Sequence, residues 1–357
     1  MGPDRPTIPC VDIAPLVRGA RLGATDASDA ERTAAASLDQ AARSAGFFYV
    51  MGHGVGDDSI DGALRASKRL FALPDATKMS LRARGGEGAG YEPSGAQKLD
   101  EGRLGEMLEL GDGVDGESGG DQKESYIAGN MTGNGGRLDA QWPVGLDGFE
   151  EAVTRYHADC RVVSAALMRG FAVALGLEPD RFEKDIDDPF TKLRLLRYPA
   201  WKKEGAIDPY VGDRAGCGAH TDWGALTLLI QDDVGGLEVC AYGRNGQNGD
   251  DGDGDEGEGA APIWMPADAV PGAILANVGD MLLRWTDGRY RSAPHRVLAP
   301  KTPGVDRHSV AFFLNCDVDA MVDARSLGLV KDGSEPKWPP ITAMGYIEER
   351  VAATYSA

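Results

Sequence analysis

Two short segments of the sequence place a histidine two residues before an aspartate, a spacing that can serve a metal ion. They read His-Ala-Asp at 157–159 and His-Thr-Asp at 220–222. The chain holds 5 histidines and 56 acidic residues among 357, so about one such pair is expected by chance. The first pair lies within a predicted helix, where residues two apart do not face each other. We therefore interpret His157 and Asp159 as part of a solvated helix face that cannot chelate a metal.

His220 and Asp222 lie in a segment predicted to be extended, just before the predicted strand 225–230. Residues two apart in a strand project from the same face, so the imidazole and the carboxylate would point together. His295, in another predicted strand, is the candidate for a third ligand. Two histidines and one carboxylate form a facial site that leaves three positions open on Fe(II). The alternative is that His220 and His295 are ordinary polar residues of a β-domain, and the pattern alone does not choose between the two.

Arg307 and Ser309 begin a further predicted strand and share one of its faces with Phe313. An arginine that points into a β-domain is costly unless an anion meets it. A guanidinium beside a hydroxyl suits a carboxylate, through charge-assisted hydrogen bonds. The alternative partner for Arg307 is an internal Asp or Glu. His308 falls on the opposite face, where we expect a structural role.

A predicted strand that ends at Tyr198 adds two cations. Tyr198, Arg194 and Lys192 share one face of this strand. If Tyr198 points inward, both cations do too, and they would suit an anionic substrate. The alternative is that they lie near the mouth of the domain and pair with local acids. Cys217 lies three residues before His220, so strand alternation places it on the other face, where we expect it to pack in the core.

The elements that must position these residues fall into two parts. Apolar residues at spacings of three and four predict helices in the N-terminal half and at the end of the chain. The predicted helices are 31–45, 58–71, 149–175 and 340–354, with a buried strand at 47–50. Beyond these, short apolar segments separated by turn residues predict an antiparallel β-sandwich or barrel. The predicted strands are 192–198, 225–230, 236–240, 272–277, 281–286, 291–298 and 308–314.

The composition argues against several classes of protein. Acidic residues outnumber Lys and Arg by 56 to 37, which gives a formal net charge of −19. This balance argues against a surface that binds nucleic acid or an anionic membrane. No apolar run approaches the ~20 residues of a membrane span, and no targeting segment is visible. The 5 scattered cysteines, without a CxxC pair, predict a reduced, cytoplasmic protein, and we expect a monomer.

Two segments, 111–122 and 243–259, are rich in glycine and acidic residues. The second cannot bury apolar area, so we expect a flexible, solvated loop. Its alternating carboxylates could also bind calcium, but the spacing lacks the final glutamate of an EF-hand.

Short motifs occur in order along nearly the whole chain. They read IPCVDI at 8–13, GFFYVMGHGV at 46–55, GYEP at 90–93, KESY at 123–126, LLRYP at 195–199, HTDWGALTLL at 220–229, GGLEV at 235–239, NVGD at 277–280 and RSAPHRV at 291–297, followed by the Arg-x-Ser strand. Together they resemble the isopenicillin N synthase-like family of Fe(II)- and 2-oxoglutarate-dependent oxygenases. The resemblance is specific for the family and says little about the substrate.

The resemblance implies an α+β fold with a double-stranded β-helix (jelly roll) core, an N-terminal α/β region and flanking helices. It divides the chain into four parts. These are an N-terminal non-haem dioxygenase-type region at 1–125, a long-helix connection at 126–190, the Fe(II)/2-oxoglutarate oxygenase domain at 191–325 and a C-terminal helical segment at 326–357.

The same resemblance implies that His220, Asp222 and His295 hold Fe(II) and carry the catalysis. 2-Oxoglutarate and O₂ would be the cosubstrates, and succinate and CO₂ would be released. The reaction would oxidise an unactivated C–H bond of a small metabolite, by hydroxylation, desaturation or ring closure. His53 matches a glycine-flanked position of the family that is structural.

Arg307 and Ser309 are expected, by this resemblance, to bind the distal carboxylate of 2-oxoglutarate, assisted by Tyr198. Two inward cations favour a carboxylate-bearing substrate. The residues that we expect to line the substrate pocket are Tyr91, Tyr126, Lys192, Arg194, Trp223 and Phe313. For Trp223 and Phe313, plain packing in the core is the alternative.

Two other functions stay open on the sequence. One is an iron oxidase of the same fold that does not use 2-oxoglutarate, in which Arg307 and Ser309 would bind the carboxylate of the substrate itself. The other is a non-catalytic binding protein on a jelly roll, because a fold does not fix a function. The intact set of candidate ligands argues against the second.

Overall fold

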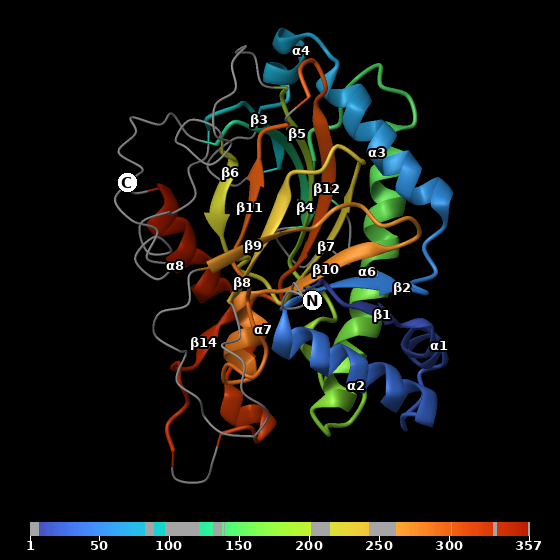
Figure 1. Ribbon diagram of the computed structural model, residues 1–357, viewed down its shortest axis with the longest axis vertical. Coiled ribbons are helices and arrows are strands. Elements are labelled where there is room, and N and C mark those ends of the chain that lie inside the picture. Colours follow the sequence, from blue (N-terminus) through green and yellow to red (C-terminus); the bar gives the residue numbers. More distant parts are fainter. Residues whose placement is uncertain are drawn as a thin grey trace, which may run out of the picture.

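Two β-sheets form the centre of the molecule, and helices pack against the larger of them (Figure 1). The computed structural model describes residues 7–82, 89–96, 121–130, 138, 140–200, 215–242, 262–300, 302–330 and 334–355. All secondary structure given below belongs to these ranges.

The larger sheet has 8 strands. In spatial order they are β1 (Cys10–Asp12), β2 (Phe47–Met51), β10 (Ile274–Val278), β7 (Leu226–Gln231), β12 (Arg307–Leu314), β5 (Thr191–Tyr198), β4 (Glu124–Asn130) and β3 (Gly90–Glu92). β1 and β2 pair in parallel, and the other neighbours pair antiparallel. Strands from both halves of the chain therefore share one sheet.

The smaller sheet has 4 antiparallel strands and carries two of the candidate ligands. In spatial order they are β6 (Ala215–His220), β11 (His295–Leu298), β8 (Leu237–Tyr242) and β9 (Pro262–Pro266). His220 ends β6 and His295 begins β11, and the two residues lie opposite each other in the register. A separate pair, β13 (Met321–Val322) and β14 (Ile341–Thr342), lies near the C-terminus.

Four helices pack together beside the larger sheet. They are α1 (Ala14–Leu22), α2 (Asp29–Ser44), α3 (Asp57–Phe71) and the long α6 (Phe149–Ala174). α6 contacts the other three, and both α3 and α6 contact β12 and β7 (Figure 1). α2 begins with a capping box, because Ser28 and Glu31 each accept the other's backbone N–H.

The remaining helical segments are short or lie late in the chain. They are α4 (Asp75–Ser80), α7 (Asp280–Trp285), α8 (Ala343–Tyr355), and the 3₁₀ turns η1 (Glu183–Asp185) and η2 (Ala324–Leu327). None of the helices within the described residues has the length and apolar character needed to cross a membrane.

The apolar interior has two parts. The larger part lies between the helices and the larger sheet and includes Leu38, Phe171 and Phe312. The second part includes Phe47 of the larger sheet and Val239 of the smaller one, so it lies between the two sheets. Each fully buried Leu, Val or Phe contributes about 1.5–3 kcal/mol to folding. The packed helices thus support the sheet from one side and leave its other face to the site.

The register of β12 fixes the direction of its polar residues. Arg307 lies opposite Tyr198 of β5, and Ser309 lies between Leu196 of β5 and Gln231 of β7. These side chains share one face of the strand, and that face points toward the smaller sheet. The register therefore gathers polar groups from three adjacent strands at one place.

The predicted helices and most predicted strands are confirmed, but one assignment is wrong. Of the residues predicted as the strand 281–286, those at 281–285 belong to helix α7. Its buried residues Met281, Leu282 and Trp285 repeat at helical spacing, but the segment is too short for periodicity to separate helix from strand. The predicted strand 291–298 is also too long, because β11 begins only at His295.

The strands that were not predicted are β3 and β4 of the larger sheet, β6 and β9 of the smaller sheet and the short pair β13 and β14. β6 contains Gly216 and Gly218 and few β-branched residues, so it carries a weak strand signal. β9 begins and ends with proline, which reads as a boundary rather than a strand. β6 and β9 are two of the four strands of the smaller sheet, so half of that sheet was not predicted.

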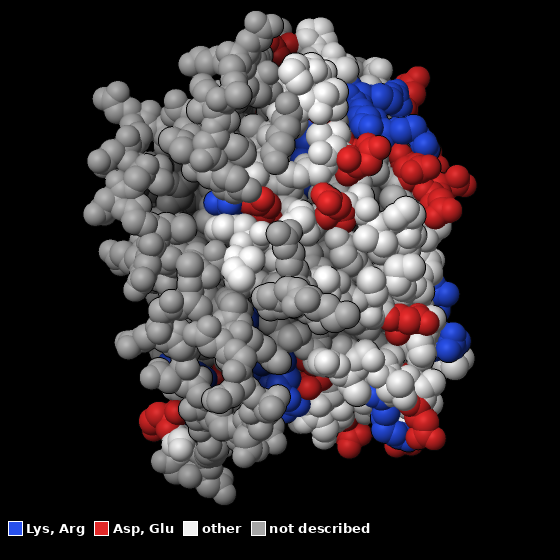
Figure 2. Space-filling view, viewed as in Figure 1, with Lys and Arg blue, Asp and Glu red and all other residues white. Residues whose placement is uncertain are grey.

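The two glycine-rich acidic segments fall mostly or wholly outside the described residues. This holds for 243–259 and for 111–122 apart from its last two residues, so the expected loop and the calcium alternative stay untested. In the face shown in Figure 2, acidic and basic side chains lie next to one another over the described surface. The division of the chain into four parts remains a prediction.

Candidate metal centre and adjoining cavity

Two imidazoles and one carboxylate converge at the edge of the smaller sheet. His220 Nε2 lies 3.9 Å from Asp222 Oδ1, and His295 Nε2 lies 3.8 Å from the same oxygen. The ring centroids of the two histidines are 4.3 Å apart. One ligand atom from each residue lies within 4.8 Å of the others, which is the spacing of donors around a single metal ion.

The local backbone differs from the one expected. His220 ends β6, and Asp222 lies beyond the strand, in the connection to β7. Strand alternation is therefore not what brings the two side chains together. Instead the connection folds back, where the backbone N–H of Asp280 donates to the carbonyl of Asp222 at 2.8 Å.

Backbone carbonyls orient both imidazoles. His220 Nδ1 lies 2.8 Å from the carbonyl oxygen of Gly218, and His295 Nδ1 lies 3.1 Å from that of Ala293. A carbonyl only accepts, so Nδ1 carries the proton and Nε2 presents its lone pair to the site. Burial lowers the pKa of His295 to about 4 and also lowers that of His220. Both rings are therefore neutral near pH 7, as metal ligands must be.

Asp222 is held in place through its other oxygen. Oδ2 accepts from Thr227 Oγ1 at 2.6 Å and from Asn277 Nδ2 at 2.7 Å, which leaves Oδ1 facing the two imidazoles. Burial opposes ionisation, but the neighbouring imidazoles and these two hydrogen bonds outweigh it and lower the pKa of Asp222. The result is an ionised, oriented carboxylate beside two neutral imidazole nitrogens, a donor set that fits Fe(II).

A buried guanidinium lies across the cavity. Arg307 is 1% exposed; its Nη2 donates to Gln231 Oε1 at 2.6 Å and its Nη1 to Ser309 Oγ at 3.2 Å. The ring of Tyr198 lies 4.9 Å from the guanidinium carbon. Burial lowers the pKa of Arg307. An internal Asp or Glu was the alternative partner, but no carboxylate of the described residues lies within ion-pair distance, and Arg307 Nε has no hydrogen-bond partner among them.

These features line a single cavity. It reaches from the three candidate ligands past Arg307 and Ser309 to Lys192, Arg194, Trp223, Phe313 and Ile347. All four side chains of the inward face of β5, including both cations, line it. An anionic ligand that extends from the candidate metal ligands into this cavity would therefore meet the positive charges of Arg307 and of Lys192 and Arg194.

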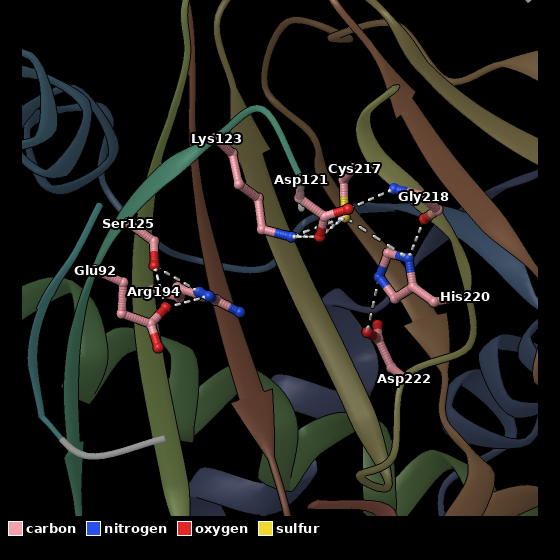
Figure 3. Close-up of polar contacts among 9 residues, drawn as sticks. All are labelled: Glu92, Asp121, Lys123, Ser125, Arg194, Cys217, Gly218, His220 and Asp222. Atoms are coloured by element: carbon pink, nitrogen blue, oxygen red, sulfur yellow. Dashed lines mark hydrogen bonds and ion pairs between the residues drawn. The ribbon is translucent and has the colours of Figure 1, made fainter. Parts of the chain in front are cut away.

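The cations on β5 also have local partners. Arg194 forms an ion pair with Glu92, and its Nε donates to Ser125 Oγ at 3.0 Å (Figure 3). The Lys192 ammonium lies 5.2 Å from the ring centroid of Phe190. Arg194 thus lines the cavity, as expected for a substrate contact, and also pairs with a local acid, as the alternative expected.

Two predicted pocket residues lie elsewhere. Tyr91 and Tyr126 do not line the cavity formed by the described residues. The Tyr91 hydroxyl donates to Glu124, and the Tyr126 hydroxyl donates to the carbonyl of Gln141. Both rings belong to the core between the helices and the sheet. Both were expected to line the pocket, but strand alternation turns them to the opposite face of the sheet.

Cys217 lies in the cavity although it was not expected there. It was expected to pack away from His220, yet it lines the same cavity. The pairing of β6 with β11 is irregular between His220 and Cys217, and a bulge there cancels the simple alternation. Its Sγ accepts a hydrogen bond from Lys123 Nζ at 3.0 Å and lies 3.9 Å from His220 Nδ1 (Figure 3). Burial raises the pKa of the Cys217 thiol to about 12.

The other histidines are structural. His157 is 2% exposed and bonds Thr191 Oγ1 at 2.8 Å, so the prediction of a solvated helix face is wrong for it. Among the described residues, the group of candidate metal ligands is His220, Asp222 and His295 and does not include His157. His308 packs on Phe71 at 6.0 Å between ring centroids, and His53 bonds the carbonyl of Gly272.

Several residues of the site escaped the sequence analysis. Asn277 and Lys123 lie inside motifs that were recognised, but neither received a role. Gln231, at the end of β7, carried no motif. Its position opposite Ser309 could be found only from strand register, which local patterns do not give.

Comparison with known proteins places the whole chain in one family. Residues 8–131 match the model described as the N-terminal region of the non-haem dioxygenase in morphine synthesis, and residues 191–315 match the 2OG-Fe(II) oxygenase superfamily. The homoarginine-6-hydroxylase 2-ODD-233 of rice (Oryza sativa subsp. japonica) is 30% identical, over 99% of each chain. The 2-oxoglutarate-Fe(II) type oxidoreductase hxnY of Emericella nidulans is 30% identical, over 87% of this chain and 80% of its own.

Solved structures agree on the fold. Full-length Neurospora crassa T7H in complex with alpha-KG matches with a TM-score of 0.77 and 27% identity, over 99% of this chain and 98% of its own. The same protein has been solved with thymine, with a TM-score of 0.76. These matches confirm the α+β fold with a jelly-roll core. The chain belongs to the Fe(II)- and 2-oxoglutarate-dependent oxygenases, and it is a non-haem dioxygenase that uses Fe(II) and 2-oxoglutarate.

Proposed function

We propose that the chain oxidises an unactivated C–H bond of a small, carboxylate-bearing metabolite, and that His220, Asp222 and His295 hold the iron. The observation that carries this proposal is the convergence of two Nε2 atoms and one Oδ1 atom at the wall of a cavity lined by cations. Fe(II), when bound, supplies the activation of O₂ that is coupled to oxidative decarboxylation of 2-oxoglutarate. The chain itself supplies position, charge and exclusion of water.

Arg307, Ser309 and Tyr198 are proposed to bind the distal carboxylate of 2-oxoglutarate. The support is physical: a fully buried guanidinium without a carboxylate partner in the described residues is costly, and an anionic cosubstrate relieves that cost. Gln231 accepts from one end of the guanidinium and so fixes the plane that the carboxylate would meet. We set aside the oxidase alternative, which does not use 2-oxoglutarate, because the relative named 2-oxoglutarate-dependent dioxygenase citB matches over 98% of this chain.

The substrate is proposed to lie against β5. Arg194 and Lys192 line the cavity on this side, and both carry charge that suits a carboxylate. Trp223 and Phe313 supply apolar wall and keep water from the reacting C–H. Of the possible outcomes we favour hydroxylation, because several relatives are named homoarginine-6-hydroxylases. We further propose a monomeric, cytoplasmic enzyme that has a small-molecule substrate and no nucleic-acid partner.

The first experiment tests the cosubstrate. Anaerobic protein with Fe(II) receives 2-oxoglutarate, the weak visible charge-transfer band is recorded, and O₂ is then admitted while succinate is assayed. A band followed by slow succinate formation supports the proposed cosubstrate site. Iron that binds without a band would assign Arg307 and Ser309 to another anion.

A second experiment tests the substrate class. Free amino acids, homoarginine among them, are compared with their methyl esters as stimulants of succinate formation. Stimulation by the free acid alone, lost in Arg194→Gln, supports the proposal. Arg197→Gln is the matched control, because Arg197 lies on the same strand but pairs with Glu124 and Asp306 outside the cavity. Equal stimulation by acid and ester would overturn the carboxylate requirement.

A further inference from the structure

A lysine, a cysteine and an aspartate meet beside the metal centre without a role in the proposed reaction (Figure 3). Lys123 Nζ donates to Asp121 Oδ2 at 2.5 Å and to Cys217 Sγ at 3.0 Å. Lys123 is 5% exposed, Asp121 7% and Cys217 4%. The amine and the thiol thus lie in contact, held by a buried carboxylate, and 94 residues apart in the chain.

This cluster has access to an oxidant. Lys123 and Cys217 both line the cavity that contains His220, Asp222 and His295. Cys217 Sγ lies 3.9 Å from Nδ1 of His220. The reaction of this family consumes O₂ in that cavity, so the pair is exposed to O₂ although bulk solvent is largely excluded from it.

We propose that Lys123 and Cys217 form a reversible covalent cross-link in which one oxygen atom bridges Nζ and Sγ. The step consumes one lysine ammonium, one thiol and one O₂. It yields the N–O–S bridge, one water and one proton. Two N–H bonds of the ammonium, the S–H bond and the O–O bond of O₂ break, and an N–O bond, an O–S bond and the two O–H bonds of water form. Sulfur and nitrogen each lose two electrons, and the four electrons reduce O₂ to the bridging oxygen and to water.

The surroundings suit this chemistry. Asp121 Oδ2 is the adjacent acceptor for the proton that the ammonium must release. Its Oδ1 accepts the backbone N–H of Gly218 at 3.1 Å, so the carboxylate is fixed between the two reacting residues (Figure 3). Oxidised cysteine sulfur is known to be captured by nearby nitrogen as well as by thiols. Here the nearby nitrogen is Lys123.

The bridge would join two sheets beside an iron ligand. Lys123 directly precedes β4 of the larger sheet, and Cys217 lies in β6 of the smaller one. A covalent link between them would hold the cavity wall next to His220 at a fixed width. We therefore expect the linked form to turn over more slowly and to recover when a thiol reduces the bridge.

The other cysteines provide internal controls. Cys160, Cys240 and Cys316 are buried, and within the described residues none of them forms a hydrogen bond to a lysine. General oxidation of thiols would affect cysteines according to their exposure, and Cys10 is the exposed one. A cross-link confined to Cys217 would therefore reflect its contact with Lys123.

The test is mass spectrometry of the intact enzyme loaded with Fe(II) and 2-oxoglutarate. One sample is kept anaerobic, one is exposed to O₂, and one is exposed and then treated with dithiothreitol. The expected result is a linked pair of peptides, containing Lys123 and Cys217, whose mass is their sum plus one oxygen and minus two hydrogens. It should appear only with O₂ and vanish with dithiothreitol.

Two variants sharpen the result. Lys123→Arg keeps the positive charge but removes the primary amine, and Cys217→Ser removes the thiol; neither should yield the linked peptides. Recovery of Cys217 as a free thiol, as a sulfinic acid, or joined to Lys123 without the added oxygen would overturn the proposal. The readout does not require turnover of a substrate, so its failure would leave the proposed oxygenase reaction untouched.

Discussion

The two His-x-Asp pairs of this chain have the same spacing and opposite surroundings. On α6, His157 bonds Thr191 Oγ1 at 2.8 Å, and Asp159 accepts from Ser59 Oγ at 2.5 Å. Each residue is satisfied by a different partner, and the two do not meet. The helix gives this pair a packing role, because residues two apart point in different directions.

At the end of β6, each residue of the second pair keeps one ligand atom that is not used in a hydrogen bond within the described part of the protein. His220 uses Nδ1 and Asp222 uses Oδ2 for internal hydrogen bonds, so Nε2 and Oδ1 face each other across 3.9 Å. His295 adds a second Nε2 from β11. We infer that the second pair can bind a metal because one atom of each residue is held by a hydrogen bond inside the protein and the other atom faces the cavity.

Loss of either member of the second pair, or of His295, should have the largest effect. His220→Ala, Asp222→Ala and His295→Ala should each abolish Fe(II)-dependent succinate formation, because two remaining ligands do not hold the ion in a defined geometry. Succinate and bound iron are measured together. Asp159→Ala and His157→Ala are the matched changes in the first pair, and both should keep iron and turnover if they fold. Activity that survives Asp222→Ala would refute the assignment of that ligand.

The next effect lies at the far end of the cavity. Arg307→Ala should raise the concentration of 2-oxoglutarate needed for half-maximal succinate formation, because a buried charge-assisted pair contributes about 2–5 kcal/mol, or roughly 30- to 4,000-fold. Iron content should not change. If the iron content fell as much as in the ligand variants, the proposal that Arg307 binds 2-oxoglutarate without holding the iron would be wrong.

Changes in the first pair should alter the stability of the fold and leave the activity unchanged. Burial lowers the pKa of His157 to about 4, below the ordinary value of 6.5. As the pH falls, His157 is therefore protonated in the unfolded chain before it is protonated in the folded one. The free energy of unfolding falls by about 3 kcal/mol between pH 6.5 and pH 4. In metal-free protein, His157→Gln should flatten the fall of unfolding free energy with acid. Urea unfolding at several pH values measures this, and an unchanged slope would contradict it.

The smallest predicted effect concerns the groups that hold Asp222. Thr227→Val and Asn277→Ala should each weaken iron binding about 10- to 100-fold, because outer partners of a ligand contribute on that scale. Ser59→Ala removes the corresponding partner of Asp159 and should leave iron affinity unchanged. Titration of metal-free protein with Fe(II) under anaerobic conditions compares the three. Equal affinities would mean that Asp222 needs no outer support.

The fold was predictable where local patterns suffice. α6 shows apolar residues at helical spacing over its whole length, and β12 carries an apolar run from Val310 to Leu314, so both were predicted to within a residue or two. β6 and α7 were not, because one is rich in glycine and the other is six residues long. Short or glycine-rich elements form when their neighbours in space pair with them, and a linear pattern does not record those neighbours.

In the candidate site, too, some residues were predicted correctly from the sequence and others were not. The candidate iron ligands and the cations Lys192, Arg194 and Arg307 were predicted from residue type, spacing and resemblance, whereas Lys123 was not. The prediction was wrong for Tyr91 and Tyr126, which belong to the other face of the larger sheet, and for Cys217, which a bulge turns into the cavity. Such errors concern which way a side chain points, and one irregular residue in a strand reverses that direction.

By itself, the sequence determined which residues can bind a metal and an anion, since ligand chemistry belongs to the side chain. It also determined the family, because motifs over nearly the whole length keep their order. Only the tertiary structure decided which oxygen of Asp222 faces the imidazoles, that Gln231 supports Arg307, and that Lys123 touches Cys217. These contacts join residues far apart in the chain, and their geometry depends on strand register and packing that no local pattern contains.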